Sequence, residues 1–298
     1  GFISYDGWAA KGELLVCKKE KCAVHNCCHF PLCQQFTFSL RSTKQGRSTA
    51  GYKFFVEEIM IQSTEGKMKD INYSITHWFQ PIYDLKSNSV IGYEALLRDA
   101  SEKDFSPISM FNDAKMKGFR ELLDVMSIKK ALDCFREELN VLFINVFPST
   151  LLKNSFLSWW DMNYTGNVPV VLELLENDPI DDWEKMKKIT RELQSRGVKI
   201  AIDDVGAGYS FFQQWIELEP DYIKLDKYFA SCLSKHPRKQ KIISFLVKLF
   251  SDDSIKIIME GIENEADLYM AEFLGISYAQ GYFLGKPFPL SELYLRFP

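Results

Sequence analysis

Two adjacent carboxylates, Asp203 and Asp204, follow an apolar run in the segment VKIAIDDVGAGYSFF, residues 198–212. The run is typical of a buried strand, and the Gly-Ala-Gly that follows predicts a tight turn before a helix. Two like charges at the end of a buried strand are unfavourable unless something cationic lies between them. We therefore expect this strand end to bind a cation, with the glycines allowing the turn to approach it closely.

Polar side chains also end most of the other short apolar runs, usually after three or four apolar residues. A single strand that emerges into solvent would look the same, but the repetition over seven runs favours one shared site. In barrel enzymes the carboxyl ends of the strands carry the active site. The residues concerned are Glu94, Asn145, Glu173, Asp203, Asp204, Lys224, Asp226, Glu260 and Gln280.

Acidic residues greatly outnumber basic ones in this predicted site. Hard divalent cations with oxygen ligands resolve such a conflict, and Asn145 adds a neutral oxygen. Asp203, at the centre, could bridge two ions that clamp the attacking and leaving oxygens of a phosphate substrate. Asp226 and Glu263 could equally be structural, holding Lys224 or a loop. The five acids expected to converge are Glu94, Glu173, Asp203, Asp204 and Glu260. Three more acids would lie nearby: Glu176, Asp226 and Glu263. The basic residues of the predicted site are Lys224 and Arg98.

No histidine is placed to act as a general base, since the four histidines are at positions 25, 29, 77 and 236, away from such strand ends. The nucleophile is therefore predicted to be a water activated by the metal ions. Lys224 is then the natural partner of that water or of the charge that develops on the phosphorus centre.

The elements that must position these residues are short β-rich runs alternating with longer helical patterns. The first two runs are joined by the turn-like KSNS (residues 86–89) and predict a hairpin, whereas the rest predict βα units. So many units favour a closed (β/α)8 barrel of the TIM type with one antiparallel strand. The predicted strands are 77–85, 90–97, 141–146, 168–174, 198–203, 221–226, 255–260 and 277–281, and the predicted helices include 119–139, 182–197, 239–253 and 263–275.

Composition sets further bounds on the chain of 298 residues. A hydrophobic fraction of 46% can fill a large core, and a net charge of −4 gives no reason to expect DNA binding. The longest apolar stretches are shorter than a membrane span, and no secretory signal begins the sequence, so we expect a cytoplasmic location. The predicted organisation is a Cys-rich segment (1–36), a linker (37–69) and a catalytic domain (70–298).

The Cys-rich segment has metal ligands of a different kind. Four of its thiolates and imidazoles could hold a structural Zn²⁺ ion, although no Cys-x-x-Cys pair is present. A poorly ordered reduced tail, a disulfide framework and an iron–sulfur form remain alternatives. The two isolated cysteines elsewhere, Cys134 and Cys232, are expected to be buried reduced thiols. The clustered ligands are Cys17, Cys22, Cys27, Cys28, Cys33, His25 and His29.

Taken together, the strand-end motifs resemble those of EAL domains, a family named for a Glu-Ala-Leu motif that here begins at Glu94. The resemblance spans residues 70–298. It implies a phosphodiesterase that hydrolyses cyclic di-GMP to linear pGpG with Mg²⁺ or Mn²⁺, on a barrel with one antiparallel strand. The matching segments, in the order of the family, are FQPIYDLKSNSVIGYEALLRD, INVFPS, LELLE, IDDVGAGYS, YIKLD, EGIENEADL and AQGYFLGKPFP.

The resemblance also implies roles for single residues. Lys224 would contact the catalytic water, Gln280 would line the site, and Gln80 and Arg98 would help to bind the nucleotide. Glu176 and Glu263 would support the ligands and the loop after Asp204. One metal would be held by Glu94, Asn145, Glu173 and Asp203, and the other by Asp203, Asp204 and Glu260.

Three departures from the family pattern affect loop closure and hence the rate: Leu174-Leu175, Val205 and Phe211-Phe212 stand where the family often has Ile-Thr, Phe and Ser-Leu. They remove no expected ligand. The alternatives to an active phosphodiesterase are an inactive cyclic di-GMP receptor that signals through a protein partner, and a scaffold that binds no nucleotide. No GGDEF-like synthase motif is present, and a homodimer is expected.

Overall fold

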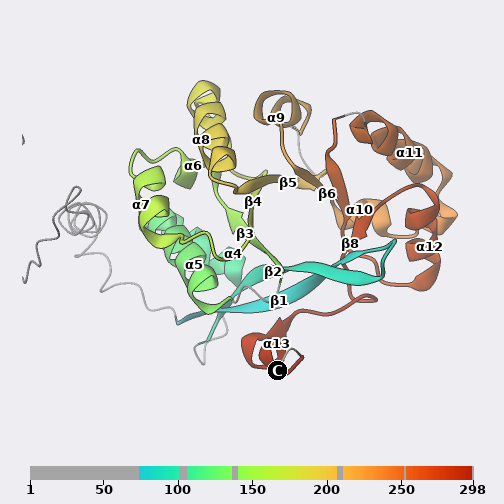
Figure 1. Cartoon of the computed structure of the whole chain (residues 1–298), viewed down its shortest axis with the longest axis horizontal. Helices are drawn as coiled ribbons and strands as arrows, with labels where there is room; N and C mark the ends of the chain where they lie inside the picture. Colours follow the sequence, from blue (N-terminus) through green and yellow to red (C-terminus); the bar gives the residue numbers. More distant parts are fainter. Residues whose placement is uncertain (1–73, 101–105, 136–139, 207–210, 252, 297–298) are drawn as a thin grey trace, which may run out of the picture. The chain divides into compact units, whose positions relative to one another are not determined.

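The structure, a computed structural model, describes residues 74–100, 106–135, 140–206, 211–251 and 253–296 (Figure 1). The domain boundaries predicted at residues 36 and 69 lie outside these residues, as do all seven residues of the Cys/His cluster between Cys17 and Cys33. Both therefore remain predictions. Within the described part of the chain, no helix combines the length and apolar character that crossing a membrane would require.

The described chain begins with the predicted hairpin. β1 (Ile75–Asp84) and β2 (Ser89–Asp99) pair antiparallel, and the side chain of Asp84 accepts hydrogen bonds from the backbone N–H groups of Lys86 and Ser87 in the turn. The hairpin prediction is confirmed, because a turn this short leaves no room for a crossover helix.

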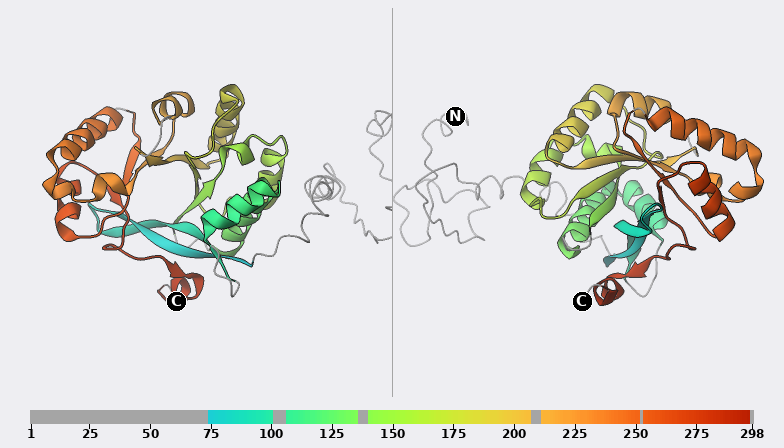
Figure 2. Two further views of the ribbon diagram at one scale, coloured as in Figure 1. Left: turned by 180° about the vertical axis from the view of Figure 1, so that it is seen from behind. Right: turned by 45° about the vertical axis from the view of Figure 1, so that its right-hand side comes forward.

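Six further strands continue the sheet in parallel and close it. β8 pairs antiparallel with β1, so that the order β2-β3-β4-β5-β6-β7-β8-β1 returns to β2 and forms the predicted closed barrel (Figures 1 and 2). A short strand, β9 (Phe288–Pro289), pairs antiparallel with Trp78 and Phe79 of β1. The parallel strands are β3 (Val141–Val146), β4 (Val170–Leu174), β5 (Lys199–Val205), β6 (Tyr222–Leu225), β7 (Lys256–Met259) and β8 (Tyr278–Ala279).

Helices surround the barrel, as Figure 2 shows from two sides. They bury apolar stripes against it: α8 buries Met186, Ile189 and Leu193, begins after the capping side chain of Asp182 and ends before Gly197 at φ +81°. The other helices are α4 (Pro107–Met116), α5 (Arg120–Cys134), α6 (Pro148–Leu151), α7 (Phe156–Asn163), α9 (Phe211–Leu218), α10 (Lys227–Ala230), α11 (Pro237–Ser251), α12 (Glu265–Phe273) and α13 (Leu290–Arg296), with α8 at Trp183–Ser195 and a 3₁₀ turn, η4, at Leu233–Lys235.

Two expectations need correction. The helix predicted over residues 119–139 ends as α5 at Cys134, because Phe135 adopts an extended backbone and packs its ring 5.7 Å from that of Phe79. The two isolated cysteines are free thiols, but Cys134 is only partly buried and Cys232 is exposed. Cys232 precedes η4 in a left-handed backbone conformation.

Candidate active site

Residues of the barrel interior form two successive layers, one apolar and one polar. Alternate residues of a strand point to the same side, so a side chain two positions after an inward apolar residue also points inward. The apolar layer contains Phe143, Val171, Ala201, Tyr222 and Ile258. Two residues further along the same strands come the side chains that form the polar layer: Asn145, Glu173, Asp203, Lys224 and Glu260.

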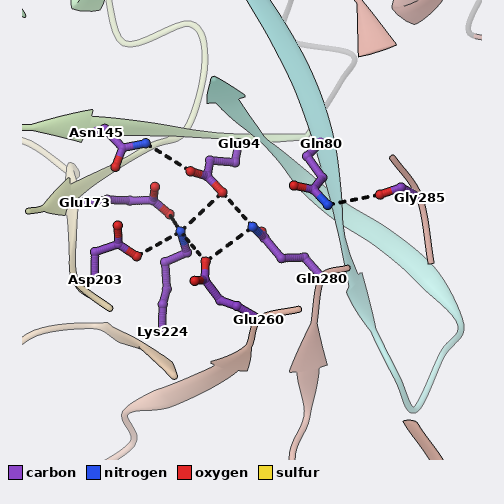
Figure 3. Close-up of polar contacts among 9 residues, drawn as sticks. All are labelled: Gln80, Glu94, Asn145, Glu173, Asp203, Lys224, Glu260, Gln280 and Gly285. Atoms are coloured by element: carbon purple, nitrogen blue, oxygen red, sulfur yellow. Dashed lines mark hydrogen bonds and ion pairs between the residues drawn. The ribbon is translucent and has the colours of Figure 1, made fainter. Parts of the chain in front are cut away.

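Lys224 lies at the centre of the polar layer, with its side chain 1% exposed (Figure 3). Its Nζ is 2.8 Å from Glu260 Oε1, 3.0 Å from Glu173 Oε1, 3.1 Å from Asp203 Oδ1 and 3.3 Å from Glu94 Oε2. The structure thus places one ammonium among four carboxylates from four strands or strand ends.

Two amide side chains complete this cluster by donating to Glu94. Asn145 Nδ2 lies 3.0 Å from Glu94 Oε1, and Gln280 Nε2 lies 2.6 Å from Glu94 Oε2 and 3.3 Å from Glu260 Oε1. Gln280 follows β8 and precedes Gly281, where a Cβ would come within 2.2 Å of the Ile262 backbone. This close approach brings together the strand ends that carry Gln280 and Glu260.

Asp203 and Asp204 reach the same site because β5 is irregular there. In a regular strand, adjacent side chains point to opposite faces. Here the pairing of β5 with β6 shifts register between Ile202 and Val205, and Asp204 has a left-handed backbone with φ +52°. As a result, Asp203, Asp204 and Glu260 each offer an oxygen within 4.8 Å of the others.

The electrostatics of the cluster favour an added cation. Burial raises the pKa of Glu173 well above its usual range and that of Glu260 to about 8. Burial, with the neighbouring Asp203 charge, raises the pKa of Asp204 to about 6. Burial alone would lower the pKa of Lys224, but the surrounding carboxylates raise it well above its usual value. With one ammonium in the cluster, these acids favour their protonated forms unless a further cation binds.

The donor atoms fit a divalent cation. Carboxylate and amide oxygens are the ligands that Mg²⁺ and Mn²⁺ prefer. Glu173 Oε2 is buried and has no hydrogen-bond donor among the described residues, so its lone pairs are available to a metal ion. Asp203, Asp204 and Glu260 form a group whose oxygens lie close enough together to share an ion. Asp203 and Glu260 also contact Lys224, as do Glu94 and Glu173.

The two residues expected to bind nucleotide lie beside the acid cluster. Gln80 pairs with Glu94 in the hairpin register, and its Nε2 donates to the Gly285 carbonyl at 3.1 Å, away from Lys224 (Figure 3). The Arg98 guanidinium lies 5.5 Å from the centre of the Trp78 ring. Arg98 and Asn145 both line a cavity of about 400 Å³ between β2, β3 and α4, so this cavity opens next to the cluster.

The three supporting acids occupy different places. Asp226 caps α10, with its side chain accepting from Tyr228 N at 2.9 Å, which favours the structural interpretation of this residue. Glu176 and Asp226 both lie close enough to Asp204 to raise its pKa. Glu263 is exposed in the loop before α12. The glycine-containing loop after Asp204 is described only at Gly206, because residues 207–210 are outside the described part.

A second group of polar residues next to the site was missed from the sequence. Arg120 and Asp124 on α5 and Asp178 after β4 are largely buried beside the cavity and contact the chain where it leaves β3. The sequence feature that could have identified this group is Asp124, a carboxylate at a position where the apolar pattern of the helix predicts a core residue.

Comparison with known proteins gives a consistent result. The EAL domain family model matches residues 70–287 of this chain. The chain is 28% identical over 256 residues to cyclic di-GMP phosphodiesterase PdeA of Borreliella burgdorferi. The alignment covers 80% of this chain and 38% of that protein. It is 30% identical over 227 residues to the probable cyclic di-GMP phosphodiesterase PdeI of Escherichia coli K12. That alignment covers 72% of this chain and 29% of that protein. The chain therefore spans less than half the length of these relatives.

Solved structures share the barrel. The EAL enzyme Bd1971, with cAMP and cyclic di-GMP bound, matches with a TM-score of 0.69 at 22% identity, over 84% of this chain and 70% of that one. BlrP1 of Klebsiella pneumoniae, in a complex with manganese and cyclic di-GMP, matches with a TM-score of 0.65 at 26% identity, over 74% of this chain and 57% of that one. The first comparison supports the fold alone, because its identity is low.

Proposed function

This chain belongs to the EAL domain family, and from that premise we propose that it is a metal-dependent phosphodiesterase that hydrolyses cyclic di-GMP to linear pGpG. The observation that carries the proposal is the buried cluster around Lys224, in which four carboxylates lie within 3.3 Å of one ammonium. Such a concentration of acidic oxygens would repel a phosphodiester unless divalent cations bound with it.

Two Mg²⁺ or Mn²⁺ ions would be held as the resemblance implies. Asp203 would be shared between the two sets, and its central place among Lys224, Asp204 and Glu260 supports that role. When bound, the ions would activate the attacking water and neutralise charge on the phosphate and on the leaving oxygen. The first set would be Glu94, Asn145, Glu173 and Asp203, and the second Asp203, Asp204 and Glu260.

Lys224 would act as a fixed positive charge rather than as a base. The surrounding carboxylates raise its pKa, so it keeps its proton at neutral pH. Its Nζ would hold the attacking water by hydrogen bonding and stabilise the negative charge that develops as the water attacks phosphorus. Gln280, which donates to Glu94 and Glu260, would orient both carboxylates. Gln80 and Arg98 would bind the nucleotide beside the cluster, and Arg98 lines the neighbouring cavity.

A hydrolysis assay with purified protein tests the proposal. We expect cyclic di-GMP to be converted to pGpG with Mg²⁺ or Mn²⁺ and to remain intact with excess EDTA. Asp203→Asn preserves the size of the side chain and should lower the rate by orders of magnitude, because it weakens both sets of ligands. If the protein binds cyclic di-GMP but leaves it intact with either metal, the receptor alternative is correct. Rapid turnover in EDTA would exclude the metal-dependent mechanism.

A further inference from the structure

The carboxylate of Asp124 holds the chain at the point where it leaves β3. Asp124 lies on α5 and is 2% exposed. Its Oδ2 accepts a hydrogen bond from the Phe147 backbone N–H at 3.0 Å. Phe147 is the N-cap residue of α6, and its own side chain makes no capping hydrogen bond to that helix. Asp124 therefore supplies, from another helix, a hydrogen-bond acceptor for this turn.

The held peptide is two residues from Asn145. Asn145 Nδ2 donates to Glu94 Oε1 at 3.0 Å, which directs the amide oxygen of Asn145 away from Glu94. Asn145 is the penultimate residue of β3, so its orientation depends on the backbone that follows it. The strand continues through Val146, whose carbonyl accepts from Leu175 N at 3.2 Å, directly into the peptide that Asp124 holds.

A second carboxylate clamps the same turn from the neighbouring strand end. Asp178, in the loop after β4, accepts from Ser149 N at 2.7 Å. Arg120 joins the contacts, since its Nη2 donates to both Asp178 Oδ1 and Ser149 Oγ at 2.7 Å. The Arg120 guanidinium also covers the Phe147 ring at 4.7 Å. The turn after β3 is thus held by α5 on one side and by the loop after Glu173 on the other.

A buried carboxylate is an expensive way to hold a turn. Its free-energy cost is reflected in the pKa of Asp124, which burial raises to about 7 despite opposing hydrogen bonds. An apolar residue would pack at this helix position without that cost, as its neighbours Leu123, Val125 and Ile128 do. The position of Asp124 is explained if the peptide that it holds has to be placed accurately.

We propose that Asp124 is a positioning residue that acts through Asn145: by holding the Phe147 peptide it sets the end of β3, and with it the Asn145 side chain beside Glu94. The inference rests on the proposed function, in which Asn145 and Glu94 are metal ligands. Side chains that orient metal ligands typically change metal affinity or activity by about 10- to 100-fold when they are removed.

The test is a double-mutant cycle of Asp124→Leu with Asn145→Ala, read by Mn²⁺ affinity in calorimetry and by kcat and KM for cyclic di-GMP. Asp124→Leu alone should lower Mn²⁺ affinity or kcat by about 10- to 100-fold, with a smaller change in KM. In the Asn145→Ala background it should add about twofold or less, because the residue through which it acts is gone. Asp124→Asn should stay within about threefold of the wild type, since its amide oxygen can still accept from Phe147.

Asp221→Leu provides a matched control at the other end of the barrel. Asp221 Oδ2 also accepts from a strand peptide, Ile200 N at 3.0 Å, but before β6 rather than after β3. Thermal melts establish that each variant is folded at the assay temperature. Asp221→Leu should lower the melting temperature and leave kcat and Mn²⁺ affinity close to those of the wild type.

Each remaining outcome contradicts the role proposed for Asp124, the proposed function, or both. Independent, multiplicative effects of Asp124→Leu and Asn145→Ala would mean that Asp124 does not act through Asn145. An equal loss in Asp221→Leu would reduce its role to general stability. If the wild type binds Mn²⁺ but hydrolyses no cyclic di-GMP, the proposed function fails while the Mn²⁺ cycle still decides the role of Asp124. A wild type that binds no Mn²⁺ overturns both.

Discussion

At the scale of single residues, Lys224 dominates the site. It is a lysine whose side chain is 1% exposed, and four carboxylates within 3.3 Å keep it charged. A charge held in a low-dielectric interior stabilises a developing negative charge more strongly than the same charge in water. Its contribution should therefore appear in the chemical step rather than in binding of the nucleotide.

Lys224→Met keeps the volume of the side chain and removes its charge. We expect kcat for cyclic di-GMP to fall by about 10²- to 10³-fold, in the range seen for loss of one charge-stabilising donor. The dissociation constant for the nucleotide should change far less. Steady-state kinetics at saturating Mn²⁺, combined with a binding titration, separate the two quantities.

Lys239→Met is the control for removal of a buried lysine. Lys239 is 7% exposed and donates to the carbonyls of Tyr228 and Ser231, away from the acid cluster. This variant should lose stability and keep its kcat at a temperature where it remains folded. The role given to Lys224 would be wrong if its substitution abolished nucleotide binding and spared kcat.

At the scale of single elements, the irregular end of β5 brings together the ligands of the two proposed metal sets. Asp204 stands at φ +52°, a conformation that asparagine and aspartate tolerate and that β-branched residues strongly disfavour. The backbone at this position and the carboxylate that it carries can therefore be tested separately, by two substitutions of the same residue.

Asp204→Asn should keep the backbone and lose the charged ligand, whereas Asp204→Val should lose both. In urea unfolding with EDTA present, we expect the free energy of unfolding of Asp204→Val to be about 1–2 kcal/mol lower than that of Asp204→Asn. Both variants should lose hydrolytic activity with Mn²⁺. Equal stabilities of the two variants would show that the left-handed conformation at this position carries no such cost.

At the scale of the whole molecule, the hairpin closes the barrel. β1 pairs with β2, β8 and β9, so it supplies the contacts that join the last strand of the sheet to the first. All the residues assigned to the proposed reaction lie at or after Gln80. The barrel that begins with β1 therefore contains the entire proposed site. Without β1, the edges of β2 and β8 that pair with it would be left unpaired.

Two truncations test this view of the fold. A chain of residues 70–298 should fold and hydrolyse cyclic di-GMP with the kcat of the 298-residue chain. A chain of residues 87–298 lacks β1 and should show no cooperative thermal unfolding by circular dichroism, because an open sheet edge replaces the closed barrel. An inactive but cooperatively folded 70–298 chain would mean that residues before 70 contribute to catalysis.

The sequence by itself determined the barrel and the identity of its polar layer. Polar side chains end the apolar runs 141–146, 168–174 and 221–226, and the carboxyl ends of barrel strands form one face, so the sequence predicts Asn145, Glu173 and Lys224 at a shared site. The short turn between the first two strands excluded a crossover helix there. These features are local, and a local pattern is enough to predict them.

Tertiary structure alone decided the contacts through which these side chains meet. Alternation would send Asp203 and Asp204 to opposite faces, and only the shifted pairing of β5 with β6 places both at the site. Gln80 faces the Gly285 carbonyl because the loop after β8 passes beside β1, which no local pattern encodes. Asp124 holds a peptide 23 positions away, and such a contact exists only once α5 has packed against β3. In each case the partner is distant in sequence, so its position is set by packing of the whole barrel.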